Sequence, residues 1–232
     1  MPFQGINIII DTIIPQSNVR YVRLKVNDVS LTLTEIYLSL IDASWINNLQ
    51  IAGALRDSLR ARVNDTIVHL SAIFNATPNL IDKSTGEYIV SESARRYLVD
   101  VLSYANIPLG ELFKQQKSGN PGFDLFSENL QNVILFGEAK YRSDNSGCYA
   151  SLKQINDFIQ TQNDSKDVWD IRDMVSPNSL VNFEAGLKGF VASFTTWNET
   201  DQDVMERITR HNAYATLSSH QEFICIAIQL NP

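Results

Sequence analysis

Three charged residues interrupt two apolar segments in the middle of the chain. Asp124 lies in Asn-Pro-Gly-Phe-Asp-Leu-Phe at 120–126, and Glu138 and Lys140 lie in Val-Ile-Leu-Phe-Gly-Glu-Ala-Lys at 133–140. Glu138 and Lys140 are two positions apart, so on a strand their side chains point to the same side of the sheet. Asp124 joins them if its own strand pairs beside theirs.

This combination of residues suits metal-dependent hydrolysis of a phosphodiester. That reaction needs neutralised phosphoryl oxygens and an activated water, and Mg²⁺ supplies both when carboxylates hold it. We predict Asp124 and Glu138 as ligands of Mg²⁺, with Mn²⁺ as a substitute ion, and the backbone carbonyl of Ala139 as a further oxygen ligand. Lys140 is suited to orient or deprotonate the attacking water, or to neutralise the developing charge. Taken by itself, a Glu-x-Lys sequence more often forms an exposed ion pair.

The surrounding elements are predicted from hydrophobic periodicity and turn residues. Strands rich in β-branched residues are expected at 6–14, 19–26 and 222–230, besides the two apolar segments around the charged residues. Helical spacing predicts helices at 33–43, 46–63, from Ser84 or Thr85 to about 105, 149–160, 166–176, 178–193 and 201–216.

Two stretches read as connections. Residues 64–83 are harder to assign, with Asn75, Pro78 and Asn79 favouring a loop, and 117–122 form a turn cluster.

The order of elements predicts an α/β fold with a mixed central sheet flanked by helices. Residues 1–80 are expected to form an N-terminal α+β extension, either a subdomain or a partner-binding layer, and residues 81–232 the core that carries the site.

The two charged blocks resemble the signature of the PD-(D/E)xK nuclease superfamily. The resemblance rests on Gly-Phe-Asp at 122–124 and Gly-Glu-Ala-Lys at 137–140, on consecutive apolar segments. It implies a restriction-endonuclease-like core, Mg²⁺ bound by Asp124 and Glu138, and a water assisted by Lys140. It therefore predicts a DNA-binding hydrolase that acts as an endonuclease.

In that superfamily a preceding helix often contributes another acid. Glu87 is seven residues before Ala94, or two helical turns, so it shares the core-facing side, whereas Glu92 falls on the opposite face. We predict Glu87 as a metal ligand and keep Glu92 as the alternative. A simpler role for Glu87 is favourable electrostatics at its helix N-terminus.

The helix after the two blocks carries Gln154-Ile-Asn-Asp-Phe158. This resembles the Gln-x-x-x-Tyr element of RecB-related nucleases, with Phe158 in place of the tyrosine. The phenolic hydroxyl is lost, so only a DNA-contacting role for Gln154 is implied. The alternative is a solvated helix residue.

A narrower resemblance is to the HamA family, the nuclease subunits of Hachiman anti-phage systems. It rests on the chain length, the two charged blocks, Leu-Lys-Gln-Ile-Asn-Asp-Phe at 152–158 and Glu-Phe-Ile-Cys-Ile-Ala at 222–227, and covers about the second two-thirds of the chain. The resemblance implies an antiviral defence nuclease that acts on DNA and is held by a helicase partner resembling HamB.

Composition bears on partners and location. The net charge of −7 is unusual for a protein that binds DNA alone, because phosphate neutralisation supplies most of that affinity, so a partner is expected to bring it to DNA. No apolar run reaches the roughly 20 residues of a membrane span, and the first residues do not form a secretory signal. Cys148 and Cys225 have no metal-ligand spacing and indicate reduced packing residues of a cytoplasmic protein.

Two other functions stay open: a non-catalytic module that binds the helicase, and a stand-alone restriction-type endonuclease.

Overall fold

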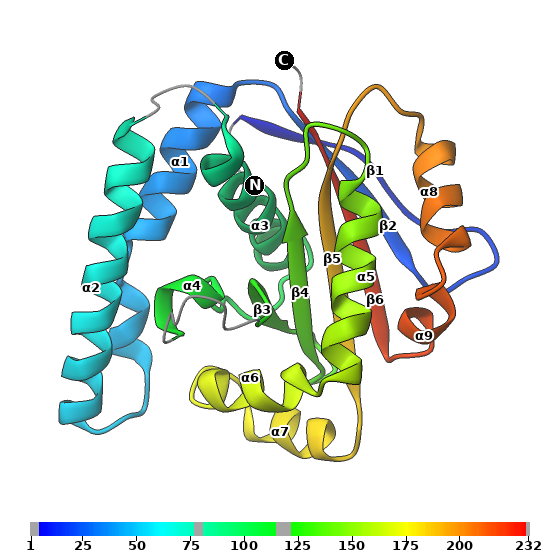
Figure 1. The fold of residues 1–232 in the computed structure, drawn as a ribbon. Helices are drawn as coiled ribbons and strands as arrows, with labels where there is room; N and C mark the ends of the chain where they lie inside the picture. The colour runs from blue at the N-terminus through cyan, green and yellow to red at the C-terminus, as the bar shows by residue number, and fades with distance from the viewer. Residues whose placement is uncertain (1–4, 77–80, 115–121, 231–232) are drawn as a thin grey trace.

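The computed structural model describes residues 5–76, 81–114 and 122–230. Its centre is a six-stranded mixed sheet of order β1-β2-β6-β5-β4-β3 (Figure 1). The outer pairs β1–β2 and β3–β4 are antiparallel, and the inner pairs β2–β6, β6–β5 and β5–β4 are parallel. The strands are β1 (Ile6–Ile13), β2 (Arg20–Val26), β3 (Leu125–Glu128), β4 (Ile134–Lys140), β5 (Lys188–Thr196) and β6 (Glu222–Leu230). The predicted α/β fold with a mixed sheet is confirmed.

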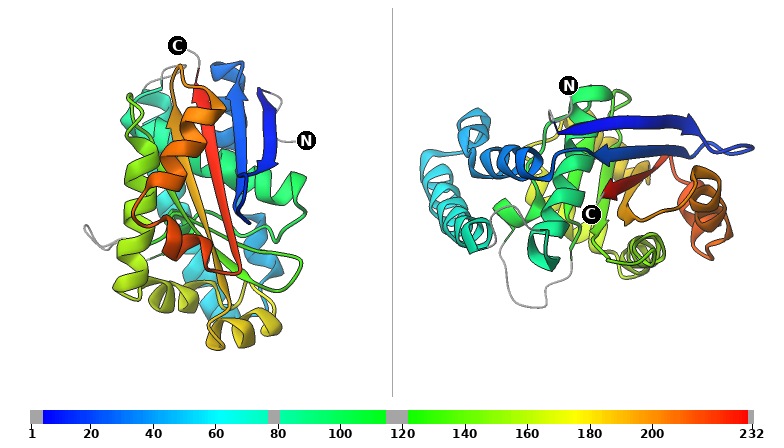
Figure 2. Two further views of the ribbon diagram at one scale, coloured as in Figure 1. Left: turned by 90° about the vertical axis from the view of Figure 1, so that its right-hand side faces the viewer. Right: turned by 90° about the horizontal axis from the view of Figure 1, so that it is seen from above.

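Helices cover both faces of this sheet (Figures 1 and 2). Helix α5 packs on β4 and β5 on one face, and α3 packs on β3, β4 and β5 on the other. The helical segments are α1 (Val29–Ile41), η1 (Ser44–Asn48), α2 (Gly53–Ala76), α3 (Lys83–Arg96), the π-helical turn η2 (Tyr97–Val101), α4 (Gly110–Phe113), α5 (Gly147–Gln160), α6 (Asn163–Ile171), α7 (Pro177–Glu184), α8 (Asp201–Arg210) and α9 (Tyr214–Ser218).

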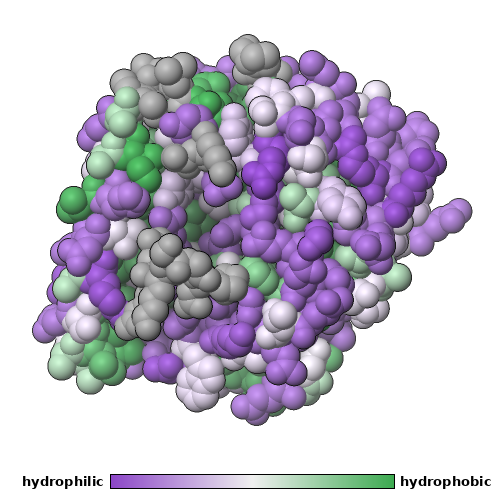
Figure 3. Space-filling model, in the orientation of Figure 1, coloured by the Kyte–Doolittle hydropathy of each residue, from purple (hydrophilic) through white to green (hydrophobic). Residues whose placement is uncertain are grey.

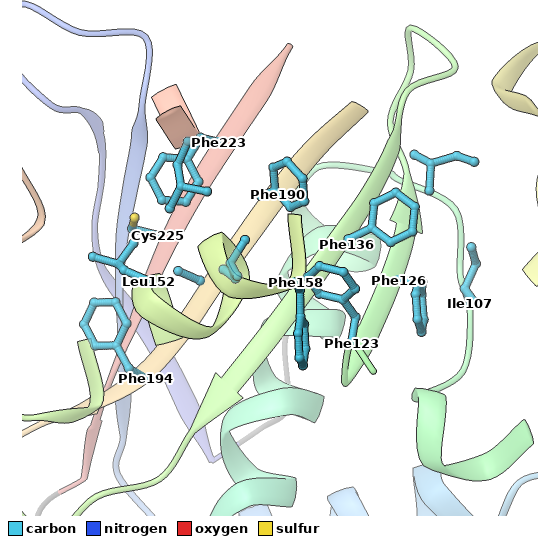
Figure 4. Packing of buried hydrophobic residues seen from close by; sticks show 14 of the residues in the cluster. Ile107, Phe123, Phe126, Phe136, Leu152, Phe158, Phe190, Phe194, Phe223 and Cys225 are labelled. Atoms are coloured by element: carbon cyan, nitrogen blue, oxygen red, sulfur yellow. The ribbon is translucent and has the colours of Figure 1, made fainter. Parts of the chain in front are cut away.

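Each face of the sheet has its own hydrophobic core, because neighbouring residues of a strand point to opposite sides. In β4, Phe136 belongs to the cluster beneath α5, whereas Leu135 belongs to the cluster beneath α3. Beneath α5 the Phe123 ring lies 5.3 Å from that of Phe136 and 5.0 Å from that of Phe158, centroid to centroid (Figure 4). The charged end of β4 is therefore anchored by large buried rings.

The helix predicted at 178–193 is wrong in its second half. Helix α7 ends at Glu184, and Gly186 follows with φ of +83°, a conformation that ends a helix readily. The chain then enters β5, which lies between β4 and β6. A central strand is buried on both faces and lacks the polar alternation that marks a half-exposed strand, so periodicity did not distinguish it from a helix.

The N-terminal helices also differ from their predicted bounds. The segment predicted at 46–63 divides into η1 and α2, and α2 continues to Ala76 through part of the stretch 64–83 that favoured a loop. Helix α2 continues because Leu59, Val63 and Leu70 keep a buried stripe along it. Pro78 and Asn79, and all of the predicted turn at 117–122 except Gly122, lie outside the described residues.

The first strands belong to the same sheet as the rest. β2 pairs in parallel with β6 from Arg20–Ile224 to Val26–Leu230. The division into residues 1–80 and 81–232 stays a prediction.

One stretch, Val29–Asn48, is long and apolar enough to cross a membrane by length and composition. It is divided between α1 and η1, and Leu33, Ile36 and Leu40 of α1 are buried in the core beneath α3. A soluble protein is consistent with this packing. Figure 3 shows hydrophilic side chains over most of the visible face, with hydrophobic ones gathered toward the edge formed by α1 and α2.

Candidate active site

Strand β4 extends beyond the end of its neighbour β3, and Asp124 lies at that end. Asp124 immediately precedes β3 and donates its backbone N–H to the carbonyl of Gly137 at 2.9 Å. A Cβ at position 137 would lie 2.5 Å from Cγ of Leu125, so glycine is needed where the two strands approach. The last three residues of β4 pair with β5 on one edge, and on the other edge they have Asp124 beside them instead of β3.

The side chain of Asp124 closes this open edge. Its Oδ2 accepts a hydrogen bond from the backbone N–H of Ala139 at 2.8 Å. In a strand, the N–H and C=O of one residue point to the same side, so the carbonyl of Ala139 is directed to the same edge. The structure thus brings Asp124 next to the residue between Glu138 and Lys140.

Glu138 and Lys140 lie on the same side of β4, as their spacing predicts. Lys140 Nζ donates a hydrogen bond to Glu138 Oε1. Glu138 is fully buried, whereas the side chain of Lys140 is 14% exposed. A Glu–Lys pair of this kind is not the exposed ion pair that was the alternative explanation.

Burial and their closeness to each other make it unfavourable for Asp124 and Glu138 both to be ionised. Burial and the neighbouring Asp124 carboxylate raise the pKa of Glu138 well above its usual value. Burial also raises the pKa of Asp124, although Lys140 and the Ala139 N–H counteract it. Burial alone would lower the pKa of Lys140, but Glu138, Asp124 and Glu87 raise it above normal. Without a metal, these shifts favour the protonated form of Glu138 and the charged form of Lys140.

The donor set fits a hard divalent cation. Glu138 Oε2 is buried and accepts no hydrogen bond from a donor in the part of the chain that the structure describes, and the neighbouring polar group is the carboxyl of Asp124. No three His, Cys, Asp or Glu side chains in these same ranges stand together as a metal cage. Mg²⁺ commonly uses only one or two carboxylates and completes its shell with waters and phosphate oxygens. Asp124, Glu138 and the Ala139 carbonyl supply oxygens of that kind.

Glu87 lies close enough to act on this site electrostatically. Its charge contributes to the raised pKa of Lys140, after burial and the charges of Glu138 and Asp124. A close contact fixes its helix here: a Cβ at Gly86 would lie 2.4 Å from the Tyr141 ring, immediately after Lys140. That Glu87 binds a metal stays a prediction.

Glu92 is committed elsewhere. It is 1% exposed, and its carboxylate accepts hydrogen bonds from Arg95 and from Ser39 of α1. These contacts tie α3 to α1 and satisfy a buried charge. They favour Glu87 over Glu92 as the acid contributed by this helix.

Gln154 lies on the helix that covers the face of Glu138. Helix α5 packs over Phe136, which has the same orientation in β4 as Glu138. Gln154 is half-buried and lies two turns after Gly147, whose Cβ position would be 3.3 Å from the Lys140 carbonyl oxygen. Its contact with DNA stays a prediction.

Sequence patterns missed a tyrosine–carboxylate pair beside the site. Tyr88 donates its hydroxyl hydrogen to Glu111 of α4. Burial raises the pKa of Tyr88, and the charges of Glu111, Glu87 and Asp124 add to this effect. Helix α4 also donates the backbone N–H of Gly110 to the Asp124 carbonyl at 2.8 Å. Only the three-dimensional contacts connect this four-residue helix to the site.

Comparisons with known proteins give no further identification. No protein-family model matches the chain, and a search of curated proteins finds no match.

Proposed function

We propose that this chain is a Mg²⁺-dependent DNA nuclease with a restriction-endonuclease-like core. One observation carries the proposal: a fully buried glutamate, Glu138, accepts a hydrogen bond from Lys140 at one oxygen and has no donor for the other among the described residues, while the carboxyl of Asp124 lies beside it. Leaving a buried carboxylate oxygen unpaired is unfavourable, and a cation relieves that cost.

The residues have distinct roles in this proposal. Asp124, Glu138 and the Ala139 carbonyl hold Mg²⁺, which supplies charge neutralisation and a more acidic water. Lys140 carries a positive charge next to the ligands and is placed to orient the attacking water and to stabilise negative charge on the phosphoryl oxygens. Glu87 adds a carboxylate from α3, and Gln154 contacts the DNA backbone.

The biological setting follows from the HamA resemblance, and the charge supports it. A chain with a net charge of −7 has little electrostatic attraction for DNA. We infer a cytoplasmic anti-phage nuclease of the HamA type, which a HamB-like helicase holds, controls and delivers to DNA.

Plasmid cleavage tests this function directly. The purified chain is incubated with supercoiled plasmid and Mg²⁺, with and without a HamB-like helicase, and compared with Glu138→Ala and Lys140→Ala. We expect Mg²⁺-dependent nicking or cutting that both substitutions abolish. Cleavage that survives both would place the activity elsewhere. Absence of cleavage in every condition, with tight helicase binding, would favour the non-catalytic module.

A further inference from the structure

A buried ion pair holds the backbone immediately before Asp124. Asp167 of α6 accepts hydrogen bonds through Oδ2 from the Phe123 N–H at 2.7 Å and from Lys114 Nζ at 2.6 Å. Lys114 Nζ also donates to the Phe123 carbonyl at 2.8 Å. One ion pair, built from two distant parts of the sequence, therefore binds both polar backbone groups of Phe123.

This ion pair is shielded from water and tightly enclosed. The side chains of Lys114 and Asp167 are 16% and 9% exposed. Lys114 Nζ lies 4.7 Å from the centroid of the Phe126 ring. A Cβ at Gly122 would lie 2.5 Å from Lys114 Nζ and 3.1 Å from both Asp167 oxygens, so a larger residue would push the pair apart. Charge-assisted hydrogen bonds in such surroundings are strong and directional.

The remaining contacts of Asp124 show what the pair adds. The Asp124 N–H bonds to Gly137 and its carbonyl accepts from Gly110, which fixes the peptide groups on either side of its Cα. The chain before Asp124 depends on Phe123, and Phe123 depends on the ion pair. We propose that Lys114 and Asp167 are positioning residues that set the Asp124 carboxylate for metal binding. This inference rests on the proposed nuclease function.

A second ion pair on the same helix provides a matched control. Asp164 is also buried on α6 and pairs with Lys188, the first residue of β5. Lys188 is the register partner of Ile134, at the end of β4 opposite to Lys140. Breaking this pair perturbs α6 similarly but leaves the backbone of Phe123 held.

The test compares Asp167→Ala and Lys114→Met with Asp164→Ala and Lys188→Met in the full chain. Mn²⁺ alone is titrated by calorimetry, the melting temperature is measured in EDTA, and plasmid nicking is measured with Mg²⁺. We expect the first two variants to bind Mn²⁺ about 10- to 100-fold more weakly, as for residues that orient metal ligands. The two control variants should stay within about twofold of wild type at a comparable loss of melting temperature. Lys114→Arg, which keeps the charge and donors, should recover most of the affinity.

The outcomes distinguish a failure of this inference from a failure of the proposed nuclease function. If the wild type binds Mn²⁺ and nicks DNA, but both sets of variants lose Mn²⁺ affinity equally, the positioning role alone is contradicted. A wild type that binds no Mn²⁺ and cleaves no DNA with its helicase would contradict both. If Asp167→Ala does not fold, Lys114→Met and its arginine counterpart carry the same comparison.

Discussion

Lys140 Nζ donates to one oxygen of the Glu138 carboxyl and leaves the other without a donor among the described residues. This arrangement gives the carboxyl two different neighbours, the ammonium group of Lys140 and the carboxyl of Asp124. In the proposed reaction, cation binding and charge stabilisation would thus depend on different atoms. The two contributions are separable by substitution.

Substitution Glu138→Gln keeps the shape and an acceptor for Lys140 but removes the charge. We expect Mg²⁺-dependent cleavage to fall by on the order of a hundredfold or more, because the cation loses a ligand. The melting temperature in EDTA should stay close to that of wild type. Thermal melts with and without Mg²⁺ check this: the wild type should gain stability from the ion and the variant should not. If Mg²⁺ raised the melting temperature of both proteins equally, Glu138 would not be a ligand of the ion.

The raised pKa of Glu138 predicts how stability depends on pH without metal. Because this carboxyl keeps its proton when folded and loses it when unfolded, the folded protein binds more protons above the ordinary glutamate pKa of about 4.3. The free energy of unfolding should therefore fall as pH rises above that value, by at most about 1.4 kcal/mol per pH unit for one proton, until Glu138 ionises in the folded state.

Urea unfolding in EDTA over a pH series measures this effect. The difference between wild type and Glu138→Gln isolates it, since other titrating groups are common to both. Saturating Mg²⁺ should flatten the difference, because the cation stabilises the ionised carboxylates. A difference that stays flat or rises with pH in EDTA would mean that the pKa of Glu138 is not raised in the folded state.

Substitution Lys140→Met should separate cation binding from catalysis. Removing the ammonium group frees Glu138 Oε1, so affinity for Mn²⁺ should equal or exceed that of wild type while cleavage is lost. Stability in EDTA should drop by roughly 3–5 kcal/mol, because buried carboxylates lose their counter-charge. Calorimetric titration and a cleavage assay on one preparation give both quantities. Loss of Mn²⁺ affinity in this variant would contradict the assigned roles.

The two glutamates of α3 should respond in opposite ways. Glu87→Gln is expected to weaken cleavage at nearly unchanged stability, because Glu87 is half-buried near Lys140. Glu92→Gln should instead lower the free energy of unfolding by roughly 3–5 kcal/mol, because it leaves Arg95 buried without its partner. Chemical denaturation and cleavage rates on both variants decide the assignment. Full activity in Glu87→Gln would mean that Glu87 does not bind the metal and acts only electrostatically at the N-terminus of its helix.

Local patterns predicted the central part of the site because its geometry is local. The two-residue spacing of Glu138 and Lys140 determines that they share a side, and adjacent antiparallel strands bring Asp124 beside them. Lys114 and Asp167 carry no such signal, since 53 positions separate them in the hydrogen bond that joins them. Their contact depends on how α6 packs, which periodicity does not describe.

The same reasoning explains the errors in the fold. A buried central strand such as β5 and a buried helix have similar apolar composition, so only its neighbours β4 and β6 identify it as a strand. The prediction ends the long helix α2 too early because Asn75, Pro78 and Asn79 favour a loop, whereas Asn75 is an exposed residue inside the helix. In both cases tertiary packing decided the structure.

The parallel pairing of β2 with β6 imposes an order on assembly during synthesis. Arg20 leaves the ribosome well before its partner Ile224, which emerges only after β3, β4 and β5. Until then β4, which carries Glu138 and Lys140, lacks the completed β5–β6 pair. It also lacks the β1–β2 hairpin that lies beyond β6 in the sheet. Such long-range pairing slows folding. A nascent chain therefore carries the residues of the site without the scaffold that brings them together.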